Sequence, residues 1–323
     1  MKTVNETIQQ LTVPTPFAVG DVHVYVIKGD TLSIVDAGVK TEEAWIALKA
    51  QLKECGYTPH DIEQVILTHH HPDHIGLTEK FPRAQIIAHK NVDPWLTRDQ
   101  LYFNHYEQFF SDCLVAFGVP KQVHQPFLNH LHEPLQYAGE GQVTVTINEG
   151  DRLPGHHDWQ VIDTKGHAQT HVSFLNTSNG TFIGGDHLLH HISSNPLLEP
   201  PPPLEKERPK PILQYRANLK KCLQLGIQTV LPGHGKTFSS IELEQLIENR
   251  LFKQEKRARD VLTLLQDKPQ TPFEICRKIF PQQYKTQLDL TMSETIGQLD
   301  FLEDNGYVKK TMIDGTFVYM PRQ

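Results

Sequence analysis

The sequence has no apolar run that approaches the ~18 residues needed to cross a bilayer. The first residues, 1–7, also lack the hydrophobic core of a secretory signal. Only four cysteines occur, Cys55, Cys113, Cys222 and Cys276, and none stands at a paired spacing. This distribution excludes a disulfide scaffold and a cysteine-based zinc motif. We therefore expect a soluble, cytoplasmic protein with reduced thiols.

An excess of positive charge is also missing. The chain has 31 lysines and arginines against 38 acidic residues, so the formal net charge is −7. A protein with this balance has no general affinity for polyanions. Its 323 residues are enough for one large or two ordinary domains. The expected partner is a small-molecule substrate rather than nucleic acid or a membrane.

Histidine, in contrast, is abundant, with 19 residues. Residues 68–74 read Thr-His-His-His-Pro-Asp-His, which brings His69, His71, Asp73 and His74 close together in the chain. Imidazoles and a carboxylate are the ligands expected for zinc, iron or manganese. The run follows a β-branched apolar segment, so it is predicted to begin where a buried strand ends, with a helix over 75–79 after it. A solvated histidine-rich loop is the alternative.

Three further metal-ligand candidates come directly after short apolar runs and beside glycine. They are His167, Asp186 and His234. Glycine lets the backbone turn sharply, so that one side chain projects from the end of a strand. Each residue taken alone would be an ordinary loop residue. Together with the histidine run they predict a metal site built at the ends of several strands.

The order His-x-His-x-Asp-His, Gly-His, Gly-Asp and Gly-His-Gly resembles the metallo-β-lactamase superfamily of hydrolases over about residues 15–240. The likeness is closest to the glyoxalase II-like branch, which carries two metals. It implies an α+β fold, the αβ/βα four-layer sandwich. It also implies seven ligands, as follows: His69, His71 and His167 for a first metal, Asp73, His74 and His234 for a second, and Asp186 as a bridge between both.

Two acidic residues have implied catalytic roles. Asp73 is expected to orient the nucleophile as well as to bind metal. Asp36, in the sequence Asp-Ala-Gly, matches the family's first acidic motif and is expected to order the His-x-His loop from behind the ligands. A plain turn is the alternative for Asp36. The implied cofactors are two divalent ions, zinc first, with iron or manganese as alternatives.

The motif residues also separate branches of the superfamily. The commonest zinc β-lactamases have cysteine at the position of Asp186, and flavin-linked diiron reductases have glutamate at the position of His71. The implied reaction is attack by a metal-bridging hydroxide on a small acyl thioester or ester, such as a hydroxyacylglutathione- or acyl-CoA-like compound or a lactone. A nuclease that acts on RNA or DNA phosphodiesters is the alternative. A metal-stabilised scaffold is disfavoured because all seven ligand positions are filled.

The domain prediction places a hydrolase domain at 1–240 and a winged-helix-like domain at 241–323. The second follows from three helical segments and a hairpin signal at Asp314-Gly315. Residues 251–323 hold eleven basic and ten acidic residues, a weak footprint for nucleic acid. An aromatic helical insert at about 91–136 is predicted either to cover the metal site or to pack as a helical pair or homodimer contact.

Two other features have simple expectations. Residues 195–204 contain four consecutive prolines, which predicts a stiff extended loop. The pairs His156–His157 and His190–His191 lie outside the motifs and are expected to be exposed.

Overall fold

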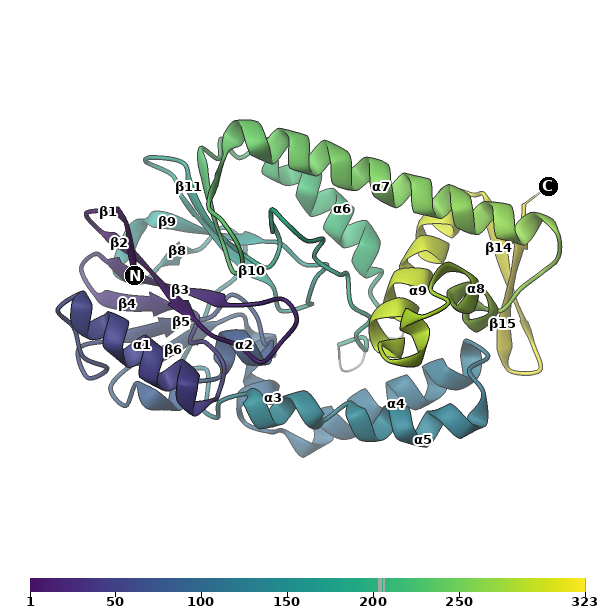
Figure 1. The fold of residues 1–323 in the computed structure, drawn as a ribbon, viewed down its shortest axis with the longest axis horizontal. Helices are drawn as coiled ribbons and strands as arrows, with labels where there is room; N and C mark the ends of the chain where they lie inside the picture. The colour runs from purple at the N-terminus through teal and green to yellow at the C-terminus, as the bar shows by residue number, and fades with distance from the viewer. Residues whose placement is uncertain (203–204, 206, 323) are drawn as a thin grey trace. The chain divides into compact units, whose positions relative to one another are not determined.

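The computed structural model describes residues 1–202, 205 and 207–322, and the chain forms two compact units (Figure 1). The first unit comprises Met1–Asp99, Pro134–Ser194 and Lys221–Glu244. The second comprises Gln100–Glu133, Asn195–Lys220 and Gln245–Gln323. Most of the predicted insert at 91–136 therefore belongs to the same unit as the C-terminal region. The predicted division into a domain of residues 1–240 and a domain of residues 241–323 stays a prediction.

Two β-sheets form the centre of the first unit. The first sheet has its strands in sequence order: β1 (Lys2–Asn5), β2 (Ile8–Val13), β3 (Val22–Lys28), β4 (Leu32–Val35), β5 (Gln64–Ile66), β6 (Gln85–Ala88) and β7 (Val145–Thr146). Neighbours are antiparallel from β1 to β4 and parallel from β4 to β7. The second sheet runs in the order β13 (Phe238–Ser239), β12 (Thr229–Pro232), β11 (Thr181–Gly185), β10 (Val172–Asn176), β9 (His156–Asp163) and β8 (Arg152–Leu153). In it, β11 and β12 are parallel and the other neighbours are antiparallel.

Alternating apolar side chains from both sheets share one buried core, since successive residues of a strand point to opposite faces. Its members include Tyr25, Ile27 and Ile66 from the first sheet and Phe174 and Leu231 from the second. Helix α1 (Glu42–Glu54) lies against β2. Helix α1 begins after the N-cap Thr41, whose side chain accepts a hydrogen bond from the Ala44 N–H at 3.1 Å.

The prediction of a helix over 75–79 after β5 is wrong. A one-turn helix, α2 (Pro72–Ile75), begins earlier, and only a 3₁₀ turn over Thr78–Lys80 follows it. Proline is favoured at the first helical position because its missing N–H would have no partner there. The early start puts Asp73 and His74 inside the helical turn, which fixes the directions of both side chains.

The remaining helices are mostly in the second unit; only α3 is wholly in the first. They are α3 (Asp93–Leu96), α4 (Gln100–Ala116), α5 (Lys121–His130), α6 (Pro211–Cys222), α7 (Ser240–Gln266), α8 (Pro272–Ile279) and α9 (Leu288–Asp304), and a hairpin of β14 (Val308–Ile313) and β15 (Thr316–Pro321) follows them. Thr271 and Glu274 form a capping box at the start of α8. The predicted hairpin turn at Asp314-Gly315 is confirmed. Phe110 of α4 packs in one core cluster of this unit with Val261 and Ile296, and Tyr106 and Phe109 pack against that cluster.

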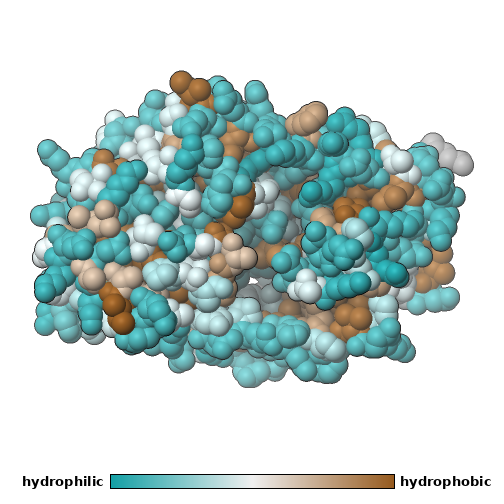
Figure 2. All heavy atoms as spheres, in the orientation of Figure 1, coloured by the Kyte–Doolittle hydropathy of each residue, from teal (hydrophilic) through white to brown (hydrophobic). Residues whose placement is uncertain are grey.

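The face in Figure 2 is predominantly hydrophilic, with hydrophobic side chains scattered over it. Within the described part of the chain, none of the helices combines the length and the apolar character that crossing a membrane would need. All four cysteines are free, as predicted. Residues 195–202 form neither helix nor strand, which agrees with the predicted loop, and Pro203 and Leu204 lie outside the described residues. That the loop is stiff and extended stays a prediction.

His156 contradicts the expectation that the pair His156–His157 is exposed. His157 is exposed, but His156 is only 4% exposed. Its Nε2 lies 2.7 Å from the hydroxyl of Ser33 on β4, so it joins the two sheets. Burial lowers the pKa of His156 to about 4. Successive residues of β9 point to opposite faces of the sheet, so His156 and His157 have different environments. The sequence alone does not indicate which of the two faces is buried.

We expect His156→Gln to reduce the acid sensitivity of folding. The folded chain keeps His156 neutral down to about pH 4, whereas in the unfolded chain it takes up a proton near pH 6.5. The unfolded state therefore binds more protons as the pH falls through this window, and the free energy of unfolding decreases. Between pH 7 and 4.5, urea titrations should show a loss about 2 kcal/mol larger for the wild type than for the variant.

The neighbouring residue provides the control for this measurement. His157→Gln removes an exposed imidazole from the next position of β9. It should leave the pH dependence of unfolding as it is in the wild type. If His156→Gln also loses as much stability as the wild type between these pH values, the buried imidazole is not the source of the acid sensitivity.

Candidate metal centre

The structure brings all seven predicted ligands together, as three overlapping groups. The groups are His69, His71 and His167; Asp73, His74 and His234; and His69, His74 and Asp186. Within each group the ligand atoms lie within 4.8 Å of one another. The first two groups are the two predicted ligand sets, and the third places Asp186 between them. Metal binding by these residues stays a prediction. Their geometry and chemistry indicate whether a metal ion would fit.

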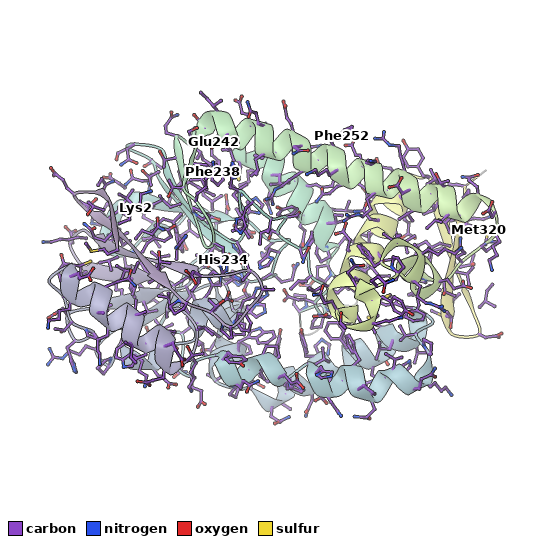
Figure 3. The ribbon with its side chains drawn as sticks, viewed as in Figure 1. Lys2, His234, Phe238, Glu242, Phe252 and Met320 are labelled. Carbon is purple, nitrogen blue, oxygen red and sulfur yellow. The ribbon has the colours of Figure 1, made fainter. Side chains whose placement is uncertain are left out.

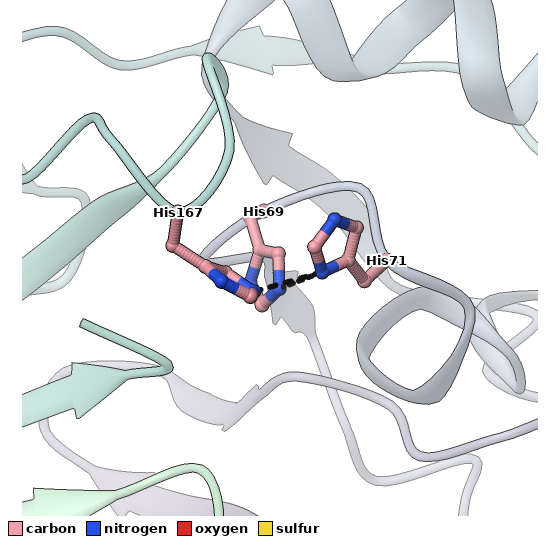
Figure 4. A group of neighbouring side chains, drawn as sticks. All are labelled: His69, His71 and His167. Atoms are coloured by element: carbon pink, nitrogen blue, oxygen red, sulfur yellow. Dashed lines mark hydrogen bonds between the residues drawn. The ribbon is translucent and has the colours of Figure 1, made fainter. Parts of the chain in front are cut away.

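The first group consists of three imidazoles that converge through their nitrogen atoms (Figure 4). Nδ1 of His71 lies 3.0 Å from Nε2 of His69 and 2.9 Å from Nε2 of His167. Gly166, with a φ of 134°, takes a backbone conformation that other residues rarely adopt, and it turns His167 toward the other two. Burial lowers the pKa of His69 and of His71 well below the ordinary range. Both are therefore neutral, the form that binds a metal ion.

The second group contains a carboxylate as well as imidazoles. Nε2 of His234 lies 3.2 Å from Oδ2 of Asp73. Asp186 contacts both groups, because Oδ1 lies 3.4 Å from Nε2 of His74 and Oδ2 lies 3.6 Å from Nε2 of both His167 and His234. The Asp186 carboxylate therefore lies against imidazoles of both ligand groups, with Oδ2 between His167 of the first and His234 of the second. A bridging ligand needs this position.

Three buried atoms show that a metal fits here. They are Nε2 of His74, Nε2 of His234 and Oδ1 of Asp186, and among the described residues none of them has a hydrogen-bond partner. A buried polar atom without a partner costs about 1–3 kcal/mol. Each of the three can offer a lone pair, and all three point into the same cluster. Divalent cations would satisfy them, so the residues present fit two such ions.

The charges of the second group also favour a cation. Burial opposes protonation of His74, but the carboxylates of Asp186 and Asp36 outweigh burial and raise the pKa of His74 well above its ordinary value. Burial would raise the pKa of Asp186, but His234 and His74 outweigh it and hold that pKa well below the usual range. The carboxylate of Asp186 thus stays ionised in a buried site and supplies negative charge that a divalent ion requires.

Asp36 lies directly behind the ligands and holds the histidine run at two points. Its Oδ1 accepts a hydrogen bond from the Thr68 N–H at 2.8 Å, and its Oδ2 accepts one from the Thr68 hydroxyl at 2.9 Å. Nδ1 of His74 donates to Oδ2 of Asp36 at 2.7 Å. This bond keeps a proton on Nδ1, so Nε2 is the nitrogen that would give up its proton to a metal ion and bind that ion. Such contacts are what the predicted ordering role of Asp36 requires.

Sequence reasoning missed two buried histidines that support this cluster. Nε2 of His171 accepts a hydrogen bond from the Asp186 N–H at 3.0 Å, and its Nδ1 lies 2.8 Å from the Thr164 hydroxyl. The ring of His70 stacks on Trp95, with 4.0 Å between the ring centroids. Their only signal in the sequence is proximity to ligands, since His70 lies inside the histidine run and His171 follows His167 closely.

Comparison with known proteins places this centre in a family. Residues 18–234 match the model of the metallo-beta-lactamase superfamily. The chain is 40% identical, over 299 residues, to the probable metallo-hydrolase YqjP of Bacillus subtilis (strain 168), and the match covers 92% of each chain. A crystal structure of a metallo-beta-lactamase family protein from Thermus thermophilus matches with a TM-score of 0.79 at 24% identity, covering 99% of this chain and 100% of that one.

A second solved structure agrees with the first. A beta-lactamase domain protein from Burkholderia ambifaria has a TM-score of 0.79 at 20% identity, with 99% of this chain and 94% of that chain covered. At these identities the two structures show the fold, and the predicted mixed α/β metallo-β-lactamase fold is confirmed. The chain belongs to the metallo-beta-lactamase superfamily and is a metal-dependent hydrolase.

Proposed function

We propose that the protein is a dinuclear hydrolase of small acyl thioesters or esters, similar to the glyoxalase II-like branch of its superfamily. The observation that carries the proposal is the carboxylate of Asp186, which contacts ligands of both buried groups. The expected ions are zinc, with iron or manganese as alternatives. Two such ions would lower the pKa of a shared water to about 7 and polarise the substrate carbonyl.

The chain's own residues have separate tasks in this reaction. His69, His71 and His167 are the candidate ligands of one ion, and Asp73, His74 and His234 those of the other. Asp73 is also the residue suited to orient the attacking water, because a carboxylate accepts a hydrogen bond from it. Asp36 keeps His74 in the tautomer that can bind. No serine or cysteine nucleophile is required.

The substrate class follows from charge and compartment. The formal net charge of −7 disfavours long polyanions and leaves small solutes as substrates. Hydroxyacylglutathione- or acyl-CoA-like thioesters and lactones fit this description. The four free thiols support a reducing, cytoplasmic location, where such thioesters would be met.

The C-terminal region is proposed to be a winged-helix-like domain that serves the hydrolase. Its support is the order of helices α7, α8 and α9 followed by the hairpin β14–β15. Several of its basic side chains are already paired within the unit. Arg257 lies 2.6 Å from Glu294, and Lys310 lies 3.5 Å from Glu303. Paired cations contribute less to phosphate binding, which disfavours the alternative of a nuclease.

We expect the purified chain to hold close to two metal ions. Two ligand groups with a shared carboxylate are too many donors for one tetrahedral ion. Elemental analysis of protein prepared without chelator, before and after reconstitution, measures the ratio, and a panel of thioesters, lactones and single-stranded RNA then tests the activity. The exposed-histidine variant His157→Gln is the control and should also bind two ions. A ratio that stays near one would refute the dinuclear centre, and cleavage of RNA alone would favour the nuclease.

Binding to generic duplex DNA or RNA is expected to be weak, with a Kd above about 10 µM at ~0.15 M salt. Residues 251–323 have a net charge of only +1, from eleven basic and ten acidic residues. Fluorescence anisotropy with a labelled duplex measures this binding, and repeating it on metal-free protein excludes contacts made through the metal centre. Sub-micromolar binding that weakens steeply with salt would overturn the small-molecule proposal.

A further inference from the structure

His234, labelled in Figure 3, lies on a loop that strand β3 holds through hydrogen bonds. The N–H of His23 donates to the Gly233 carbonyl at 2.7 Å, and Nδ1 of His234 donates to the Asp21 carbonyl at 2.8 Å. Val22 and His234 form an isolated antiparallel bridge. These backbone contacts align the loop with the beginning of β3 and place the proton of His234 on Nδ1, so Nε2 has a lone pair for a metal.

Two side chains of β3 add to these backbone contacts. Nε2 of His23 donates to the Gly235 carbonyl at 2.6 Å, and the Tyr25 hydroxyl donates to the Pro232 carbonyl at 2.7 Å. The exposed fractions of the two residues are 7% and 1%. Residues 23 and 25 alternate onto the same face of β3, toward the second sheet. One contact lies on each side of His234 in the chain.

The loop needs this support because its own sequence supplies little rigidity. His234 is flanked by Gly233 and Gly235, and glycine has the largest backbone freedom to lose. Glycine is required at 233, since a Cβ there would lie 2.3 Å from Oδ1 of Asp186. Gly235 has a φ of 81°, which also favours glycine. Close approach to the metal cluster thus excludes stiffer residues, and the rigidity has to come from outside the loop.

We propose that His23 and Tyr25, together the β3 clamp, are positioning residues that set the affinity of the second metal ion by fixing His234. The inference rests on the proposed dinuclear site and adds two residues that bind neither metal nor substrate. The first ligand group has no member on this loop, so the clamp acts on one ion and not on the other. Thr12 completes it, because its hydroxyl lies 3.2 Å from Nδ1 of His23 and holds that ring in place.

Tyr25→Phe tests the clamp with the smallest change, the loss of one hydroxyl. The metal-free full-length chain is titrated with Zn²⁺ alone, in competition with a chromophoric chelator. His71→Ala and His234→Ala identify which of the two dissociation constants belongs to which site. We expect Tyr25→Phe to raise the Kd of the second site by about tenfold and to leave the first unchanged, since partners behind a ligand typically contribute 10–100-fold in affinity.

His23 allows a test by rescue. His23→Leu removes the donor to Gly235 and should weaken the second site by about tenfold. His23→Gln can place an amide N–H near the position of Nε2 and should recover most of the affinity, whereas a purely structural role for His23 would not distinguish the two in metal binding. If His23→Leu fails to fold, Tyr25→Phe still decides the matter.

A buried tyrosine in the second unit is the matched control. The hydroxyl of Tyr215 accepts a hydrogen bond from Arg250 at 2.6 Å, and that unit contributes no member to the ligand groups found among the described residues. Tyr215→Phe should lower the thermal stability of the metal-free protein without changing either Kd. A wild type with two ions and an unaltered second site in Tyr25→Phe would overturn the clamp alone, as would equal weakening of both sites. A wild type that binds a single ion would overturn the dinuclear function and the clamp together.

Discussion

Replacing Asp186 with alanine is expected to reduce hydrolytic turnover by about a thousandfold or more, about 4 kcal/mol of transition-state stabilisation. Asp186 contacts His74 and His234 of one ligand group and His167 of the other. In the proposed dinuclear centre, its loss would remove the negative charge that both ions share. Zn²⁺ titration should therefore show two weakened sites, unlike the β3-clamp variants, which weaken one. Turnover is measured with the thioester or ester of the substrate panel that the wild type hydrolyses fastest. Metal loss is measured by elemental analysis.

His187→Ala is the neighbouring control for this experiment. His187 follows Asp186 in the chain and is fully buried, but it belongs to none of the ligand groups. Only one of two successive side chains at a strand end can point toward the metals. We expect turnover in His187→Ala to fall by less than about tenfold, with a lower unfolding temperature from lost packing. Comparable losses of turnover and metal at both positions would show that the end of β11 is misassigned.

The clustering of the candidate ligands was predictable from the sequence because its signals are local. Four candidates lie within residues 69–74, directly after an apolar strand, and the other three come after short apolar runs and beside glycine, so the residue type and the turn can be read from the same few positions. His167 and His234 are examples, since the glycines that turn their loops are adjacent in the chain. The resemblance to a known family then supplied the partition into two sets, which spacing alone could not give.

The features that could not be predicted depend on distant partners. The burial of His156 is decided by Ser33, which lies in the other sheet and 123 residues away in the chain. The end of α2 contacts the segment after β4, where the Ala37 N–H donates to the His74 carbonyl at 2.7 Å, and the sequence near α2 does not reveal this partner. The core of the second unit joins α4 to the C-terminal helices across more than a hundred residues. Local patterns show which side chains are apolar, but not which of them meet.

Replacing Asp36 with asparagine should weaken the second metal site by 10- to 100-fold and lower turnover accordingly. Asp36 accepts hydrogen bonds from Thr68 and from Nδ1 of His74. An asparagine that keeps its oxygen toward Thr68 turns its amide donor toward His74. Nδ1 must then accept, and the proton of the imidazole moves to Nε2, the atom that faces Asp186. A protonated Nε2 has no lone pair to offer a metal ion.

The substitution isolates this effect because it changes little else. Asp36 has a φ of 62°, a left-handed conformation that asparagine adopts as readily as aspartate, so the turn after β4 is preserved. Asp30→Asn, at an exposed position of the same unit, is the matched control and should keep both ions. Zn²⁺ competition on the metal-free chain measures the affinities, and thermal unfolding checks the fold. If Asp36→Asn binds both ions as tightly as the wild type, the tautomer of His74 does not depend on the Asp36 carboxylate. The ordering role of Asp36 would then have to come from its contacts with Thr68 alone.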